Sequence, residues 1–293
     1  MTALRVEGLK TTLRGGAPDI LADVSLAVQS GETLGVVGES GSGKSMLALS
    51  IMDLLPPGVE RRAGRVLLDG RDLAGLDRAG RRRARAGVAA MIFQEPMTSL
   101  NPVMRVGAQI AEALRLRVAL DRRAERAAIV ELMTRAEIAG ADSRIDAYPH
   151  ELSGGMRQRV MIAIALAAQP RLLIADEPTT ALDVTIQAQI LDLIRELRDE
   201  RGMAILLITH DLGVIAELCD RVAVMYGGRI VEEAAVAPLF DRPAHPYTAG
   251  LLASRPRLGV SDVRLPTIPG AVPGLGAFPP GCRFAPRCAL ARA

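Results

Sequence analysis

Short apolar runs alternate with segments of helical periodicity along most of the 293-residue chain. Four runs are almost continuously apolar, as expected of strands buried on both faces of a largely parallel sheet: Thr33–Val37, Val88–Phe93, Leu172–Ala175 and Ile205–Thr209. The residues that directly follow them are Gly38, Gln94, Asp176 and His210. Because ligands of open α/β sheets bind outside the carboxyl ends of the strands, the pattern predicts a ligand site at these residues.

The regions around this sheet have different patterns. Val24–Val28 and Gly64–Leu68 alternate or precede turn signals, which predicts antiparallel strands. Between residues 97 and 155, Gln109–Val118 and Arg122–Ala136 have amphipathic helical periodicity, which predicts a helical insertion. From Pro238 onward the pattern is lost, and the six prolines between Arg264 and Cys288 predict irregular, extended structure there.

Composition changes this picture little. The chain is 49% apolar and 24% charged with a net charge of +3, which is typical of a globular protein and favours nucleic acid only weakly. Met1–Lys10 lacks the apolar centre of a signal peptide, and Val160–Pro170 is shorter than the roughly 18 residues of a membrane span, so a membrane role requires a partner. Three cysteines form no even disulfide framework, which favours a reduced, cytosolic setting.

A cluster of arginines before the second predicted sheet strand has two interpretations. It binds phosphate, or it forms a solvated loop or helix face, which is the usual reading of a charge run. Its members are Arg81, Arg82, Arg83 and Arg85.

The first chemical motif follows the strand Thr33–Val37 and fits the pattern Gly-x4-Gly-Lys-Ser. Its glycines let backbone N–H groups curl around phosphates, Lys44 places a positive charge on them, and the Ser45 hydroxyl ligates Mg²⁺. The helix predicted over Met46–Leu55 points its positive end at the anion. The motif consists of Gly38, Glu39, Ser40, Gly41, Ser42, Gly43, Lys44 and Ser45.

The second motif ends the strand Leu172–Ala175. Asp176 is placed to hold the coordination shell of Mg²⁺, and Glu177 to accept a proton from an attacking water. Adjacent carboxylates at a strand end can also be plain surface, but this alternative does not explain their occurrence beside a phosphate loop.

The third motif is Ser153, Gly154 and Gly155, which begin the helical pattern Met156–Ala168. Such a helix N-terminus is able to bind an anion. One nucleotide does not need two such sites in one chain, so we expect this one to bind a nucleotide held by another subunit. Taken alone, the stretch would be a Ser N-cap with glycines for tight packing.

These motifs, together with Gln94, Ala181-Leu182-Asp183 and His210, resemble the nucleotide-binding subunits of ABC transporters over about residues 4 to 288. The resemblance implies a P-loop NTPase of α/β class with a parallel-sheet core, an N-terminal antiparallel β subdomain and a helical insertion. It also implies roles for single residues. Glu177 would be the general base, Gln94 would contact metal and water, His210 would touch the γ-phosphate, Asp183 would line a dimer interface, and Ser153 and Gly155 would close over the partner's ATP.

Two further segments are similar to bacterial oligopeptide and dipeptide importers. One is Phe93–Pro102, and the other is a C-terminal set formed by His245-Pro246-Tyr247-Thr248, Arg264-Leu265-Pro266 and Cys282–Cys288. The resemblance implies an ATPase domain over 1–240, with its helical subdomain at about 97–155, and an importer-type extension over 241–293. The implied function is ATP hydrolysis that energises peptide import; nickel and other solutes are the alternative cargo.

The same resemblance implies partners and a location. We expect two transmembrane permease subunits, a related or identical ATP-binding subunit in a head-to-tail dimer, an indirect link to a solute-binding protein, and no nucleic acid. The chain would lie peripherally on the cytoplasmic face of the inner membrane. A soluble ABC ATPase acting on DNA or ribosomes, a P-loop kinase and an exporter with a separate permease are the rival interpretations.

The sequence departs from this family pattern at two places. No aromatic residue occurs between Leu9 and Val28 to stack on adenine, so Leu13 or Ile20 would pack on the base instead. Many relatives hold an iron–sulfur cluster with further cysteines, whereas only Cys282 and Cys288 occur here, so they are free thiols unless the tail is incomplete. Cys219 is expected to be a small core residue.

Overall fold

The computed structural model describes the whole chain except residues 17, 96–98, 180–183, 255–266 and 293. Its contacts divide the chain into two compact units. The first unit consists of residues 1–4, 28–32 and 68–206, and the second unit of residues 5–27, 33–67 and 207–293. Within the described ranges, no helix has both the length and the apolar character needed to cross a membrane.

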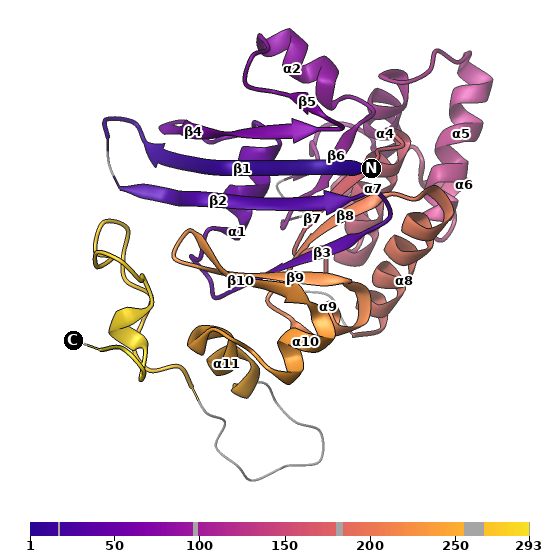
Figure 1. The fold of residues 1–293 in the computed structure, drawn as a ribbon. Coiled ribbons are helices and arrows are strands. Elements are labelled where there is room, and N and C mark those ends of the chain that lie inside the picture. The colour runs from indigo at the N-terminus through magenta and orange to yellow at the C-terminus, as the bar shows by residue number, and fades with distance from the viewer. Residues whose placement is uncertain (17, 96–98, 180–183, 255–266, 293) are drawn as a thin grey trace. The chain divides into compact units, whose positions relative to one another are not determined.

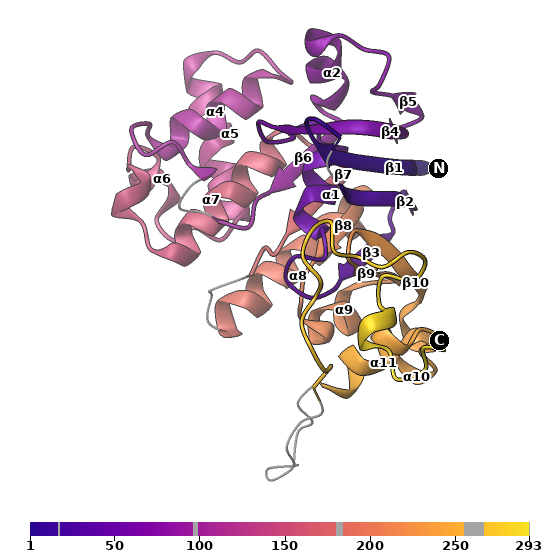
Figure 2. The same cartoon turned by 90° about the vertical axis from the view of Figure 1, so that its left-hand side faces the viewer.

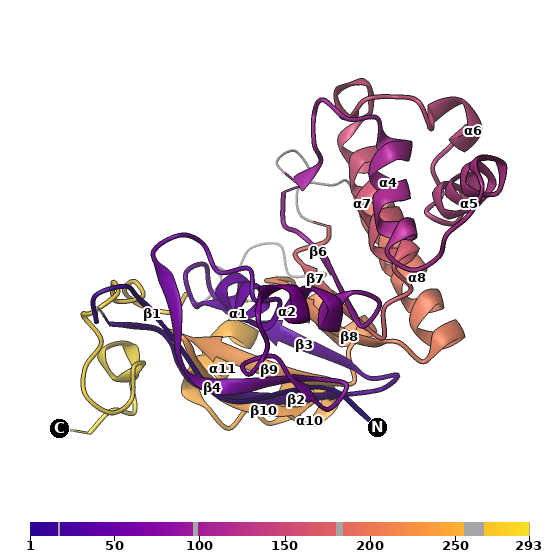
Figure 3. The same ribbon diagram turned by 90° about the horizontal axis from the view of Figure 1, so that it is seen from above.

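The second unit contains two groups of strands. The strands β2 (Asp19–Gln29), β1 (Thr2–Leu13) and β4 (Val59–Leu68) are neighbours in that order. Figure 1 shows them side by side, and in the view from above in Figure 3 they overlap. The other group has the order β10 (Arg229–Ala235), β9 (Arg221–Tyr226), β3 (Thr33–Val37) and the end of β8 (Ala204–Ile208). β3 pairs with β9 in parallel, and β10 pairs with β9 antiparallel with a bulge between Ile230 and Glu232.

In the first unit, the start of β8 is followed in the sheet order by β7 (Leu172–Asp176) and β6 (Ala89–Ile92). β6 and β7 pair in parallel, with Ala89 opposite Leu172 and Ile92 opposite Ala175. The strands β3, β7 and β8 have five residues each, and every one of these residues is buried, as expected of strands covered on both faces. The four predicted sheet strands are therefore confirmed to within one or two residues.

The helical segment of the first unit is built around α7 (Gly154–Ala167). It contacts α4 (Val106–Arg115) and α5 (Arg122–Arg135), and α5 also contacts the short α6 (Ala141–Arg144), as Figure 2 shows. Apolar side chains of α4 and α5, among them Ile110 and Met133, are fully buried, which explains the predicted amphipathic periodicity. The first unit also contains β5 (Arg71–Asp72), α2 (Arg78–Arg85), the 3-10 turn Pro149–Glu151 and α8 (Val184–Arg201).

The arginine cluster lies on α2. The side chain of Asp77 caps this helix by accepting a hydrogen bond from the Gly80 backbone, and Arg81 Nε donates to the Leu76 carbonyl at 2.9 Å. Both contacts are local ones at the start of the helix. The solvated helix face, one of the two predicted alternatives, accounts for these contacts without a phosphate.

Two helices lie where the sequence pattern was lost, from about Pro238 onward, and the sequence did not predict them. α10 (Val236–Asp241) and α11 (Pro246–Ala253) follow β10 and lie next to it in Figure 1. Proline is compatible with the first turn of a helix, because its missing N–H would have no partner there. Pro246 occupies this place in α11, where the His245 side chain accepts a hydrogen bond from the Tyr247 backbone.

These helices complete a core in the second unit. Leu239 of α10, Tyr247 of α11 and Phe284, beside the 3-10 turn Ala285–Arg287, pack with buried residues of β9 and with Ile215 of α9 (Leu212–Leu218). Cys219 packs against the same cluster, which confirms the prediction that it is a small core residue. The C-terminal segment therefore belongs to the core of the unit that carries α1 (Lys44–Ile51) and the loop before it.

Candidate functional site

The predicted phosphate loop connects β3 to α1, and glycine is required at both of its ends. A Cβ on Gly38 would lie 2.1 Å from the backbone oxygen of Met225. Gly43 has a φ of 104°, and its Cβ would lie 3.1 Å from the side chains of Leu21 and Met225. No side chain caps α1, so the N–H groups of its first turn face the loop without a competing side-chain acceptor. The loop has the local structure that an anion site needs.

Lys44 is the first residue of α1, and it is 7% exposed. Its ammonium group donates to the carbonyl oxygens of Gly38 at 2.7 Å and Glu39 at 3.1 Å, so the loop folds back over the lysine. A buried positive charge is costly unless it meets negative charge or strong acceptors. The burial of this ammonium group inside a glycine-rich loop fits an anionic ligand.

His210 lies at the end of β8 within the second unit. It lines a cavity of about 390 Å³ together with Val37, Gly38 and Glu39. Asp211, Leu212, Leu251 and Ser254 complete the lining. The structure thus brings His210 and the start of the phosphate loop to one cavity, as the placement of both at strand ends predicts.

The first unit brings together the other two predicted catalytic residues. Gln94 Nε2 donates a hydrogen bond to Glu177 Oε2 at 3.2 Å, across 83 residues of sequence. Glu177 has a φ of 48°, a conformation that a non-glycine residue adopts at a cost, and such backbone strain concentrates at functional sites. The residue before it, Asp176, ends β7 and is 3% exposed. The structure thus pairs the Gln94 amide directly with the Glu177 carboxylate just beyond the ends of β6 and β7.

The Ser153-Gly154-Gly155 stretch begins α7. The Ser153 hydroxyl caps the helix by accepting a hydrogen bond from the Met156 backbone at 3.3 Å. Ser153 and Gly154 are exposed, whereas a Cβ on Gly155 would touch Ile186 at 3.4 Å. The exposed N-terminus of a 14-residue helix is accessible to a ligand from outside the chain.

Two more residues concern the predicted site: Asp183, which the sequence predicted, and Tyr247, to which the sequence assigned no role. Asp183 lies outside the described residues. Tyr247, which the sequence analysis quoted only as part of a resembling tripeptide, is fully buried, and its hydroxyl accepts a hydrogen bond from the Glu39 backbone at 2.8 Å. Burial raises the pKa of Tyr247, so the phenol keeps its proton. No local signal in the sequence connects these two residues, which are 208 positions apart.

Family comparison agrees with this geometry. The family model of ABC transporters matches residues 21–180, and that of the oligopeptide/dipeptide transporter C-terminal region matches residues 231–293. The chain belongs to the ABC transporter family. The resemblance stated from the motifs is confirmed by these two matches.

Relatives of the full chain lead to the same family. A Brucella ovis protein named as a peptide import ATP-binding protein is 54% identical over 98% of this chain and 89% of its own length. A second such protein, from Brucella abortus, is 51% identical over 99% of this chain and 88% of its own.

Solved structures confirm the predicted fold class. The dimeric ATP-binding cassette MJ0796, bound to ADP and Pi after hydrolysis, superposes with a TM-score of 0.72 at 28% identity, covering 80% of this chain and 98% of that one. The subunit cbiO1 of the Clostridium perfringens transporter complex cbiONQ gives a TM-score of 0.70 at 27% identity, covering 82% and 91%. The ABC ATPase fold, with a mixed sheet, a β subdomain and helices, is therefore established for this chain.

Proposed function

We propose that this chain is the ATP-hydrolysing subunit of an importer for oligopeptides or dipeptides. The ATPase part rests on the family and on the loop around Lys44. The cargo rests on the match of residues 231–293 to the oligopeptide/dipeptide C-terminal region and on the peptide-import names of the Brucella relatives. The observation that carries the proposal is the buried Lys44 ammonium inside the phosphate loop.

Hydrolysis follows from the residues in each unit. The loop amides and Lys44 bind the phosphates, and His210 contacts the γ-phosphate from the cavity wall. Glu177 accepts the proton of the attacking water, and Gln94, bonded to that carboxylate, orients the same water. Positioning and charge neutralisation supply most of the rate enhancement, because a phosphoryl group in transfer needs little covalent help.

Each unit offers oxygen donors of the kind that Mg²⁺ prefers. The second unit offers the Ser45 hydroxyl, and the first unit offers the Gln94 amide oxygen and the Asp176 carboxylate. When bound, the ion neutralises phosphate charge. Among the described residues, no group of three or more His, Cys, Asp or Glu is placed to hold a metal ion.

The partners follow from the incomplete second site. The exposed Ser153 and Gly154 would close over the ATP of a second, related or identical subunit, and Asp183 would line that interface. Closure and reopening of this pair would move the helical segment at α4–α7 against two permease subunits. The chain would then work peripherally on the cytoplasmic face of the inner membrane.

The test is ATP turnover by the assembled transporter in proteoliposomes with its solute-binding protein. Oligopeptides or dipeptides should stimulate phosphate release and accumulate inside, and Lys44→Ala should abolish both. Stimulation by Ni²⁺ but not by peptides would reassign the cargo. ATP turnover that Lys44→Ala leaves intact would reject the phosphate loop itself.

A further inference from the structure

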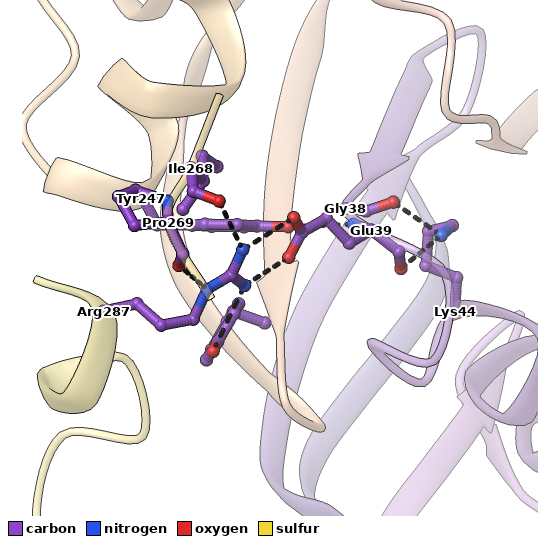
Figure 4. Close-up of polar contacts among 8 residues, drawn as sticks. Gly38, Glu39, Lys44, Tyr247, Ile268, Pro269 and Arg287 are labelled. Carbon is purple, nitrogen blue, oxygen red and sulfur yellow. Dashed lines mark hydrogen bonds and ion pairs between the residues drawn. The ribbon is translucent and has the colours of Figure 1, made fainter. Parts of the chain in front are cut away.

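An arginine from the C-terminal segment is bound to the phosphate loop. The guanidinium of Arg287 donates to both carboxylate oxygens of Glu39, at 2.6 and 3.0 Å, in the two-pronged geometry that arginine alone provides. Figure 4 shows this pair together with Tyr247 and Lys44. Glu39 is the second residue of the phosphate loop, and Arg287 follows it by 248 residues.

The arginine is held in place for this contact. Its side chain is 4% exposed, and it also donates to the backbone oxygens of Pro269 at 2.8 Å and Ile268 at 3.3 Å. The hydroxyl of Tyr226 lies 3.5 Å from the same group. The hydrogen bond to Glu39 raises the pKa of Arg287 further above its usual value, so the charge is permanent.

Glu39 is fixed at all of its polar groups. Its backbone N–H donates to Tyr247, its carbonyl oxygen accepts from Lys44, and its carboxylate accepts from Arg287. Two of these three contacts come from the C-terminal segment. The segment therefore positions the first turn of the phosphate loop.

The charge of Glu39 gives this contact a second consequence. A carboxylate in a loop that binds a polyanion repels the ligand, and at 29% exposure solvent screens that charge only in part. The positive charge of Arg287, bonded to this carboxylate, offsets the repulsion between Glu39 and the phosphates. We propose that Arg287 is a positioning residue for ATP binding, which holds Glu39 and neutralises its charge so that the loop accepts phosphate. This inference rests on the proposed ATPase function.

The test is a double-mutant cycle on the affinity for MgATP, measured in the full chain with Glu177→Gln as the parent so that ATP is not consumed. Arg287→Met should weaken binding on the order of tenfold at low salt, the size expected when a charge-assisted contact is lost. Adding Glu39→Gln should restore the affinity to within about threefold, because it removes the uncompensated charge. Raising the salt to about 0.5 M should reduce the Arg287→Met defect by screening.

The control is Arg242→Met, which removes an exposed arginine from the same region and should leave binding unchanged. A purely structural arginine would lower the melting temperature without rescue by Glu39→Gln and without salt dependence, and that result would overturn the proposal. Unchanged affinity in Arg287→Met would do so as well. If Arg287→Met does not fold, the test uses Arg287→Lys, which keeps the positive charge but loses the two parallel hydrogen bonds to Glu39. This variant should bind MgATP more weakly than wild type, but by less than the tenfold expected for Arg287→Met. Wild-type affinity at both salt concentrations would reject the positioning role.

Failure of the wider function gives a different result. If the parent itself does not bind MgATP, the ATPase assignment is wrong. If the parent binds and the cycle shows no coupling, only the role of Arg287 is lost. In the hydrolysing chain, Arg287→Met should raise KM for ATP while kcat changes less than about twofold, since the proposed role of Arg287 acts on ATP binding through Glu39 and not on the reacting groups.

Discussion

Helices α1 and α7 both begin at glycine-rich stretches that suit an anion, but their surroundings differ. The loop before α1 contains a buried lysine, requires glycine at Gly38 and Gly43 and is held by the C-terminal segment. The start of α7 has an exposed serine and an exposed glycine and no cation of its own in the motif. The difference supports the proposal that the loop before α1 binds the phosphates with groups of its own chain, whereas the start of α7 contributes to a nucleotide site on a second subunit.

The largest expected effect concerns Glu177, the proposed general base. Glu177→Gln should lower phosphate release on the order of 1000-fold, because it removes the general base, while both helix N-termini stay intact. Size-exclusion chromatography in MgATP should then show a stable dimer, of identical chains or with the related subunit. Turnover at the wild-type rate would show that another group acts as the base.

A change in the loop before α1 should alter MgATP binding by the monomer. Lys44→Ala should weaken MgATP binding by roughly 100-fold, because the phosphates lose their buried cationic partner. Titration at protein concentrations where the chain is monomeric measures this. A loss confined to turnover, with binding intact, would contradict the comparison between the two helix starts.

A change in the second site should leave a single chain unaffected. Asp and Asn both cap helices about as well as Ser, so the pair Ser153→Asp and Ser153→Asn keeps α7 and differs only in charge. Ser153→Asp should reduce turnover about tenfold more than Ser153→Asn by repelling the partner's nucleotide, with the monomer's affinity unchanged. Equal turnover in the two variants would argue against a phosphate near Ser153.

The smallest expected effect is the loss of stability of α11 at low pH. Burial lowers the pKa of His245. The pKa of Glu232 is also lowered, because hydrogen bonds from the Ala244 and His245 backbone N–H groups to its carboxylate help to outweigh the opposing effect of burial. A histidine held neutral in the fold costs stability below its unfolded pKa, and a carboxylate with a lowered pKa loses its contribution as pH falls further, so both destabilise α11 toward low pH.

The expected sign is therefore a melting temperature that falls between about pH 7 and pH 5. His245→Asn keeps a capping side chain but does not titrate, so it should remove about 2 °C of that fall. The pH dependence of MgATP affinity should weaken in parallel, because Tyr247 follows this cap. A pH profile identical to wild type would exclude His245 as its source.

The sequence predicted the sheet and the loop well, for a physical reason. Strands buried on both faces have continuous apolar runs, and Gly38, Lys44 and Glu177 are local in sequence to strand ends. The start of α1 was predicted two residues late because the positive φ of Gly43, which sets the helix start, leaves no trace in apolar periodicity.

The features that the sequence could not predict depend on contacts between distant residues or on prolines, which can either break a helix or occupy its first turn. Pro238 and Pro246 suggested broken structure, yet both lie in helices whose stability comes from packing Leu239 and Tyr247 on β9. The pair Glu39 and Arg287 has no local pattern, since 248 residues separate its members. The residue roles at Gln94, His210, Ser153 and Asp183 stay predictions, and the variants above test that of Ser153.

The 248-residue separation of Glu39 and Arg287 in the sequence also sets the order in which they are synthesised. At about 5 to 20 residues per second, a ribosome makes Arg287 roughly 12 to 50 s after Glu39. During that interval the nascent chain contains the phosphate loop with its carboxylate uncompensated. Nucleotide binding by the growing chain would therefore be weak, and it would reach full strength only after the segment around Arg287 leaves the ribosome and folds onto the loop.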